Sequence, residues 1–367
     1  MNKKIPYVNI QEQWASDKEE LLPIIDSLLG SGQYIGGKEI SDFETSVAAL
    51  CDVRYAVALN SGTDALVLGL SALGVKPGDE VITPPNSFIA STAAIVHLNA
   101  VPVFADVLED QNIDPKEIEK LITKKTKAIM PVHLTGRMAR MNEIMDIAKK
   151  FSISVIEDAA QSIGSKYENK MSGSIGNVGC FSTHPLKNLN ACGDGGFLTT
   201  NDELIYKKVS FARNHGLIDR NTVESFGFVS RMDALQAAIL NYRLKKLPDL
   251  IEKRRNNAEK YRRQLNPKHI YIPEDKPNEF NTYHTFVIQV EKRDELQEYL
   301  LANGIETAIH YPIPIHLQPA SKKLGYKLGD FPKTESQAKR ILTLPINQYI
   351  KPEELERVAD TVNQFYK

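Results

Sequence analysis

Lys187 is the residue in this sequence whose neighbours best suit imine chemistry. It lies in the run Phe181-Ser-Thr-His-Pro-Leu-Lys187-Asn, shortly before a glycine-rich turn. A lysine amine forms imines with carbonyl cofactors when burial or a nearby charge lowers its pKa. A lone lysine near glycines is more often a solvated surface charge, so this interpretation depends on the residues that accompany it.

A first companion is a turn suited to phosphate. In the run Asn60-Ser-Gly-Thr-Asp-Ala-Leu, Gly62 lets backbone amides approach an anion where a helix begins, and Ser61 and Thr63 add hydroxyl donors. The alternative is an ordinary helix cap, which any βα unit can have. Ser182, five residues before Lys187, offers a further phosphate donor.

An aromatic ring and a carboxylate follow two other predicted strands. Phe88 could stack on a flat heteroaromatic ligand, although a core phenylalanine is the commoner explanation. Asp158 ends an apolar run, where a buried carboxylate is costly unless a cation meets it. A protonated pyridine nitrogen is one such partner, and a structural helix cap is the alternative. Together with Lys187 and the phosphate turn, this set predicts a pyridoxal phosphate site.

The segments that carry these residues follow a βα rhythm from about residue 54 to 200. Short, nearly continuous apolar runs such as Tyr55–Leu59 and Ile153–Asp158 alternate with helical patterns, which indicates a mostly parallel sheet with helices on both faces. Ligands of such sheets bind at the carboxyl ends of the strands. We therefore expect an α/β fold whose large domain covers residues 1–245.

The pattern changes after a long charged helix that we expect over 232–265, interrupted at Pro248. Strands are predicted at 283–290 and 306–310, and helices at 294–303 and 352–365. These elements indicate a small α+β domain over residues 246–367.

Composition excludes several classes of protein. Lys and Arg total 45 against 46 Asp and Glu, so no basic field is expected to hold nucleic acid. Apolar runs are too short to cross a membrane, and no export signal is visible. The three cysteines are far apart, which suits a reducing cytoplasm. The histidines lack ligand spacing, so no metal site is expected, and short basic runs such as Lys253-Arg-Arg255 are interpreted as solvated.

With these motifs in place, the chain resembles the sugar aminotransferases of the DegT/DnrJ type, which are fold-type I pyridoxal 5'-phosphate enzymes. The resemblance covers essentially the whole chain. Its motifs are Ser31-Gly-Gln-Tyr-Ile-Gly-Gly, Asn60-Ser-Gly-Thr-Asp-Ala-Leu, Glu157-Asp-Ala-Ala-Gln-Ser-Ile-Gly, Phe181-Ser-Thr-His-Pro-Leu-Lys-Asn, Arg213-Asn-His-Gly, Ser230-Arg-Met-Asp-Ala-Leu-Gln-Ala-Ala and Gly329-Asp-Phe-Pro.

The resemblance implies a role for each site residue. Lys187 would hold the cofactor as a Schiff base and move the proton during amination. Asp158 would pair with the pyridine nitrogen and Gln161 with the ring hydroxyl. Phe88 would cover the ring. The phosphate would be held by Gly62, Thr63 and Ser182.

One departure from the family concerns a second subunit. Many relatives carry Gly-x-Asn before the Arg-Met helix, and the asparagine reaches the phosphate of the neighbouring subunit. This chain has Gly227-Phe228-Val229 there, and valine cannot make that hydrogen bond. A homodimer with active sites at the interface is still expected.

The substrate prediction depends on a proline-rich segment after residue 304. Its His310-Tyr311 pair resembles the segment of relatives that aminate C-3 of nucleotide-linked 6-deoxy keto-sugars, and Thr183 stands where some of them place tyrosine. We therefore predict amination of a keto-sugar nucleotide, with L-glutamate as the donor. Three alternatives stay open: amination at C-4, transamination of a small phosphorylated ketone, and a non-catalytic cofactor-binding regulator.

Overall fold

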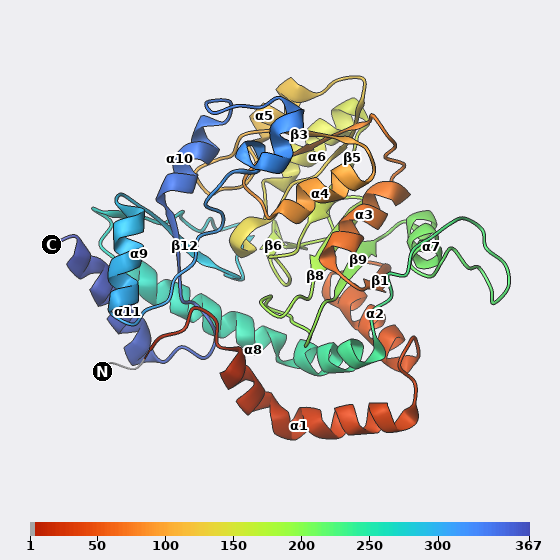
Figure 1. Ribbon diagram of the computed structural model, residues 1–367, viewed down its shortest axis with the longest axis horizontal. Helices are drawn as coiled ribbons and strands as arrows, with labels where there is room; N and C mark the ends of the chain where they lie inside the picture. Colours follow the sequence, from red (N-terminus) through yellow and green to blue (C-terminus); the bar gives the residue numbers. More distant parts are fainter. Residues whose placement is uncertain (1–3) are drawn as a thin grey trace.

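A seven-stranded sheet forms the centre of the computed structural model, which describes residues 4–367 (Figure 1). Its strand order is β1-β9-β8-β5-β4-β2-β3. β9 pairs antiparallel with β1 and β8, and the other pairs that involve neighbouring strands are parallel. The strands are β1 (Tyr55–Leu59), β2 (Glu80–Thr83), β3 (Val101–Phe104), β4 (Thr126–Ile129), β5 (Ser154–Asp158), β8 (Val178–Ser182) and β9 (Gly196–Thr200). The predicted mostly parallel α/β sheet is confirmed.

Helices cover both faces of this sheet, which explains why its strands are apolar throughout. In β1, Val57 and Leu59 pack against one set of helices, while Ala56 and Ala58 pack against another. The first set includes α3 (Gly62–Ala72), α4 (Ile89–His97) and α7 (Glu203–Ala212); the second includes α2 (Lys38–Leu50) and the start of α8 (Ala234–Gln264). Towards the β3 edge, α5 (Pro115–Leu121) and α6 (Met141–Phe151) join a third cluster.

The C-terminal part has its own core around an antiparallel sheet of β10 (Ile270–Tyr271), β12 (Phe286–Val290) and β13 (Ile341–Leu344). Helices α9 (Arg293–Ala302) and α11 (Pro352–Phe365) pack on it, and α10 (Pro332–Arg340) precedes β13. Ile5, from the other end of the chain, is buried in the same cluster. The strand expected at 306–310 is wrong, because only Ala308 in this segment pairs, through a single bridge to Thr343.

Helix α8 joins the two parts, as Figure 1 shows. The predicted interruption at Pro248 is wrong, because Pro248 lies inside α8, which is continuous over its 31 residues. Leu247 and Ile251 are buried on either side of it, and this packing outweighs the lost backbone hydrogen bond. The proposed boundary at 245/246 falls inside α8, so we keep the division into two domains as a proposal.

Two further elements bear on the site. Helix α1 (Ile10–Ser31) lies along α8, where Leu21 packs against Ile239 and Tyr242 (Figure 1). Short elements fill the remaining connections: β6 (Lys166–Tyr167), β7 (Lys170–Met171), β11 (Glu279–Phe280) and the 3₁₀ turns η1 (Leu134–Gly136), η2 (Ile315–Leu317) and η3 (Pro319–Leu324). Within residues 4–367, no helix is long and apolar enough to cross a membrane.

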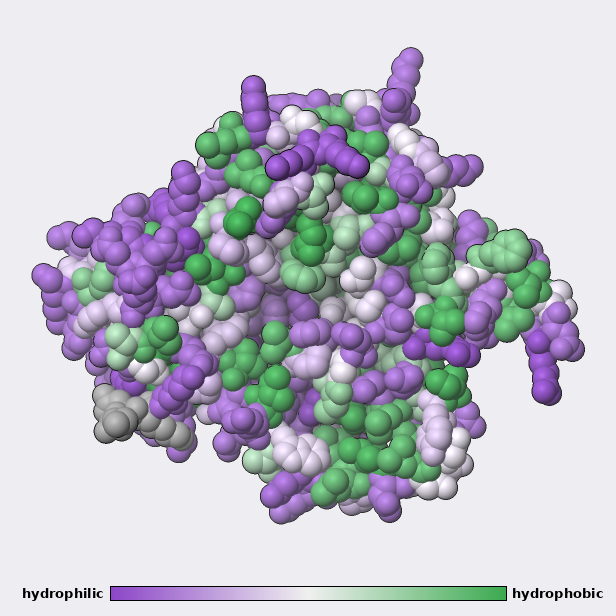
Figure 2. Space-filling model, viewed as in Figure 1, coloured by the Kyte–Doolittle hydropathy of each residue, from purple (hydrophilic) through white to green (hydrophobic). Residues whose placement is uncertain are grey.

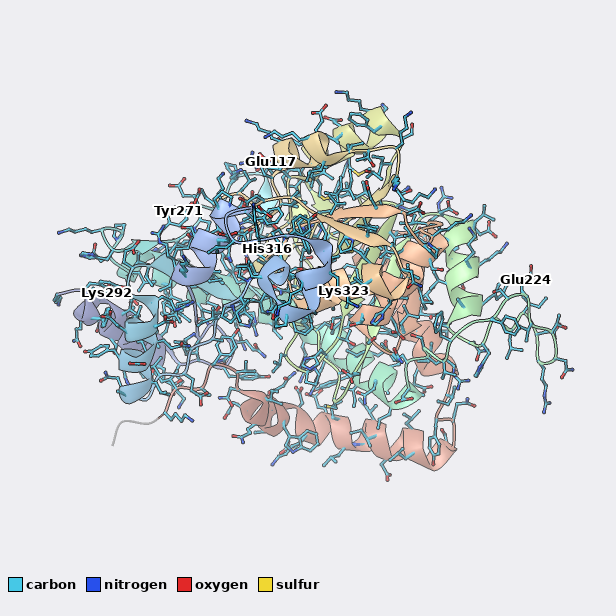
Figure 3. All side chains as sticks on the ribbon, turned by 45° about the horizontal axis from the view of Figure 1, so that its top comes forward. Glu117, Glu224, Tyr271, Lys292, His316 and Lys323 are labelled. Atoms are coloured by element: carbon cyan, nitrogen blue, oxygen red, sulfur yellow. The ribbon has the colours of Figure 1, made fainter. Side chains whose placement is uncertain are left out.

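A loop between α7 and α8 projects from the body of the molecule. Figure 3 labels Glu224 on this loop, far from the central sheet. Figure 2 shows apolar side chains gathered on the projection, and Phe226 and Phe228 are among its exposed apolar residues. Val229 lies at the base of the loop, paired through a backbone bridge with Asn214. Exposed apolar groups of this kind commonly mark a protein interface.

Candidate active site

A cavity of about 360 Å³ opens at the carboxyl ends of β1, β5 and β8. All of the predicted site residues except Thr183 line it. They are Ser61, Gly62, Thr63, Phe88, Asp158, Gln161, Ser182, Lys187, His310 and Tyr311. The fold therefore brings together side chains that are up to 250 residues apart in the sequence (311 minus 61).

The start of α3 forms an anion cradle on one side of the cavity. Ser61 caps the helix, and its Oγ accepts a hydrogen bond of 3.0 Å from the amide of Asp64. The amides of Gly62 and Thr63, at the same helix start, have no intrahelical acceptor. The cap interpretation is therefore right for the Ser61 side chain, and it leaves two amides and the Thr63 hydroxyl at the cavity for a phosphate.

Close backbone contact brings Ser182 to this cradle. A Cβ on Gly62 would lie 2.7 Å from the Cβ of Ser182, and one on Gly196 would lie 2.4 Å from the carbonyl carbon of Ser61. Real Cβ atoms do not approach so closely, so both positions need glycine. The end of β8 and the start of α3 can therefore present their hydroxyl and amide donors to one ligand.

Asp158 ends β5 as a buried carboxylate that faces the cavity. Its Oδ2 accepts a hydrogen bond of 2.6 Å from Ser91 Oγ, and its Oδ1 accepts one of 3.2 Å from the amide of Ala160. None of the described lysines, arginines or histidines forms an ion pair with it. A buried carboxylate without a cation fits a protonated ring nitrogen in the cavity.

Gln161 lines the cavity together with two aromatic rings, Phe88 and Tyr311. Gln161 Oε1 accepts a hydrogen bond of 2.8 Å from the amide of Thr135, and its Nε2 donates to the Tyr311 hydroxyl at 3.3 Å. The Tyr311 and Phe88 ring centroids lie 5.8 Å apart. Phe88 is 56% exposed although it lines the cavity, so its ring is free to be covered by a flat ligand.

The Lys187 amine points into this cavity from the loop after β8. Burial lowers its pKa from 10.5 to about 8, and the charge of Asp158 opposes part of this effect. About a tenth of the amine is therefore unprotonated at pH 7, far more than for an ordinary lysine, and this is the form that attacks a carbonyl. The solvated-lysine alternative does not apply here.

Two buried polar contacts hold the loop that carries Lys187. Gln13 on α1 and Asn190 exchange amide hydrogen bonds of 2.9 Å in both directions. Arg243 on α8 donates to the Asn190 carbonyl at 2.8 Å and forms an ion pair with Asp17 at 3.2 Å. These partners anchor the loop at Asn190, three residues after Lys187, from outside the cavity.

Thr183 does not face the cavity. Its side chain is fully buried, and its Oγ1 has no hydrogen-bond partner in the described structure. A Cβ on Gly195, which does line the cavity, would lie 2.4 Å from this oxygen. We propose that Thr183 supports the cavity floor behind Gly195 rather than contacting a substrate.

His310 and Tyr311 reach the cavity from the C-terminal part of the chain. His310 Nδ1 is 2.9 Å from Thr343 Oγ1 on β13, and its ring packs edge-on against Tyr311 at 5.3 Å. Burial, with a smaller effect of the Lys187 charge, lowers the pKa of His310 to about 4. The imidazole is therefore neutral at physiological pH and serves as a hydrogen-bonding group.

Several cavity residues were not predicted from the sequence. They are Tyr7, His184, Asp194, Arg254, His284 and Asn347, and Ser91 lies just behind Asp158. The interpretation of 253–255 as a solvated run is wrong for Arg254, which is 7% exposed. A signal existed, because Arg254 continues the buried stripe of Leu247, Ile251, Ala258 and Tyr261 along α8.

A lysine, a buried carboxylate and an anion cradle at one edge of a seven-stranded, mostly parallel sheet define the aminotransferases of fold type I. The chain belongs to the DegT/DnrJ/EryC1/StrS aminotransferase family, whose model matches residues 15–363. No cluster of three or more potential metal ligands occurs within the described residues.

Similar proteins include a named sugar transaminase and two solved structures. The chain is 39% identical, over 98% of its length and 99% of the relative's, to a dTDP-3-amino-3,6-dideoxy-alpha-D-galactopyranose transaminase of Aneurinibacillus thermoaerophilus. It superposes on S. venezuelae DesV in complex with a ketimine intermediate with a TM-score of 0.97 and 36% identity, covering 100% and 99% of the two chains. The chain also superposes on NtdA from Bacillus subtilis with bound cofactor PMP. The TM-score is 0.92, the sequence identity is 34%, and the match covers 99% of this chain and 85% of NtdA.

The lowered pKa of Lys187 predicts a pH dependence that cofactor-free protein should show. Below pH 8 the amine is mostly protonated and unreactive, and above it the amine is mostly free. We expect the rate of recombination with pyridoxal phosphate to rise with pH and to be half-maximal near 8. Stopped-flow absorbance from pH 6 to 10 measures it. A rate still rising tenfold per pH unit above 9 would contradict the lowered pKa.

Proposed function

We propose that this protein transfers an amino group from L-glutamate to the C-3 carbonyl of a nucleotide-linked 3-keto-6-deoxyhexose, using pyridoxal 5'-phosphate. The observation that carries the proposal is one cavity that combines Lys187 and Asp158 with the anion cradle of α3 and opens against His310 and Tyr311. The names of relatives with 3-amino sugars support the choice of C-3.

Each cavity residue has a role in this proposal. When bound, the cofactor supplies an electron sink for the reacting carbon. Asp158 would hold the ring nitrogen protonated, Gln161 would donate to the ring hydroxyl and Phe88 would cover one face of the ring. Ser61, Gly62, Thr63 and Ser182 would bind the phosphate. Lys187 would carry the cofactor and then move the proton at the substrate carbon.

The substrate side of the cavity is assigned to His310 and Tyr311. The neutral His310 imidazole and the Tyr311 hydroxyl are hydrogen-bonding groups that suit the hydroxyls of a hexose. Burial raises the pKa of Tyr311, so its hydroxyl stays protonated and can donate. Because Tyr311 is also bonded to Gln161, the sugar and the cofactor ring would share one hydrogen-bonded wall.

A homodimer is part of the same proposal. The exposed apolar side chains of the loop between α7 and α8 would be covered by a second subunit. Val229 lies at the base of that loop and its side chain has no hydrogen-bond donor, so the phosphate would depend on the donors of its own chain.

Separate half-reactions test the proposal. L-glutamate added to the purified holoenzyme should remove the visible band of the lysine-bound cofactor and release 2-oxoglutarate. A panel of 3-keto and 4-keto sugar nucleotides, and a phosphorylated ketone, is then added to the aminated enzyme. Recovery of the band with a 3-keto sugar nucleotide supports the assignment. Recovery of the band only with another acceptor would contradict it. If L-glutamate does not react with the holoenzyme, a non-catalytic regulator would be favoured.

A further inference from the structure

Arg254 is a buried cation at the cavity without a matching anion. It lies on α8 with 7% of its surface exposed, and it lines the same cavity as Lys187. No carboxylate of residues 4–367 forms an ion pair with it. An arginine buried in this way is costly unless its charge is compensated, which makes Arg254 an exception among the buried arginines.

The other buried arginines show the usual arrangement. Arg137 pairs with Asp275 and Glu279, Arg243 pairs with Asp17, and Arg293 pairs with Asp294. Each of these cations has its anion within the chain. Arg254 therefore differs from them in two ways: it has no carboxylate partner among the described residues, and it lines a ligand cavity.

Neutral groups hold the Arg254 guanidinium in place. Its Nη1 donates to the carbonyls of Tyr283 and His284 at 3.1 and 3.0 Å, and its Nη2 donates to Gln348 Oε1 at 3.1 Å. Its Nε has no partner in the described structure. Burial lowers the pKa of Arg254 to about 10, so the group remains a cation at neutral pH. The site is thus preorganised for a charge that the protein does not supply.

The surroundings favour an anion close to the reacting amine. His284 interacts electrostatically with both Lys187 and Arg254, so both cations lie near one imidazole. The phosphate cradle on α3 already has its own donors. The diphosphate of a sugar nucleotide must lead outward to its nucleoside, whereas Arg254 is enclosed. A carboxylate attached near the reacting amine carbon suits this position better.

We propose that Arg254 binds a carboxylate of the amino donor and so selects amino acids over other amines in the first half-reaction. This inference rests on the proposed function. A carboxylate would complete an ion pair with a guanidinium whose position is already fixed, which gives a charge-assisted hydrogen bond at little entropic cost. Arg254 would be a specificity determinant supplied by the helix that joins the two domains.

The test compares L-glutamate with its two monoamides, L-isoglutamine and L-glutamine, in single-turnover half-reactions of the holoenzyme. Arg254→Met should weaken L-glutamate binding by about 30-fold or more, the range expected when one partner of a buried ion pair is removed. It should also remove the preference of the wild type for glutamate over one of the amides. Loss against the α-amide assigns the α-carboxylate, and loss against the γ-amide assigns the side chain.

Two further variants control for structure. Arg254→Lys keeps the charge but loses the planar fork, so it should recover part of the preference. Arg255→Met is the matched control, because Arg255 donates to the Asn281 carbonyl but does not line the cavity. It should leave glutamate binding within about twofold of the wild type.

Three outcomes would overturn the inference. One is an equal loss of binding affinity in Arg254→Met for glutamate and for both amides, which would mean that Arg254 has only a structural role. Another is an unchanged preference with weaker cofactor binding. The third is weaker binding of the sugar nucleotide alone, which would assign Arg254 to the diphosphate. If wild-type holoenzyme reacts with none of the three donors, the proposed function itself fails, which is a separate result.

Discussion

Lys187→Ala is expected to eliminate the visible band of the lysine-bound cofactor and to lower the rate of amino transfer by at least about 10³-fold. The variant loses both the point of attachment and the proton carrier, and general acid–base catalysis alone contributes roughly 10²–10⁴-fold. Absorption spectra and single-turnover kinetics of the purified variant measure both effects. A retained band would mean that another lysine holds the cofactor.

Folding should survive this substitution. Because burial lowers the pKa of Lys187, the protonated amine that predominates at neutral pH is less stable in the folded than in the unfolded chain, and alanine removes that cost. The cofactor-free variant should therefore melt no lower than cofactor-free wild type. Lys170→Ala, at an exposed position on β7, should keep both the band and the rate.

Asp158→Asn is expected to lower the rate of both half-reactions by on the order of 10²–10³-fold, the range seen when one electrostatic partner of a transition state is removed. Asparagine is nearly isosteric and can still accept the hydrogen bond from Ser91. The loss would therefore report the missing charge. Rapid kinetics with L-glutamate, together with the affinity for pyridoxal phosphate, measures it.

Ser91→Ala separates the effect of the Asp158 charge from the effect of its hydrogen bond. Ser91→Ala removes one hydrogen bond to Asp158 but keeps the carboxylate, so we expect a loss of about tenfold, equivalent to one ordinary hydrogen bond. Asp146→Asn, an exposed position on α6, should have no effect. If Asp158→Asn fell no further than Ser91→Ala, the negative charge would have no catalytic role.

Sequence patterns predicted the sheet and one side of the site for the same physical reason. Apolar strands buried on both faces are easy to recognise, and parallel strands bring their carboxyl ends to one edge. Residues at or just after the ends of β1, β5 and β8 could therefore be grouped from the sequence alone. The errors came where pairing is tertiary: residues 306–310 look like a strand but make one bridge, and Pro248 looks like a helix end but is held by packing on both sides.

The other side of the site was hidden because it is built from segments with ordinary local patterns. Tyr7 and Asn347 come from opposite ends of the chain, and neither lies in a motif. Arg254 was concealed by its charged neighbours, although its place on the buried stripe of α8 was visible in principle. Thr183 shows the opposite case: it directly follows Ser182, the last residue of β8, yet Ser182 lines the cavity and Thr183 does not.

The tight glycine contacts at the phosphate cradle divide the site into parts with different mutational tolerance. At Gly62 and Gly196, any side chain would collide with backbone or Ser182 atoms, so amino-acid substitutions are not tolerated at these two positions. The segment around His310 and Tyr311 lies outside the central sheet, joined to it through side chains such as Gln161. Natural drift or laboratory selection for new acceptors should accumulate in that segment, while the cradle stays fixed.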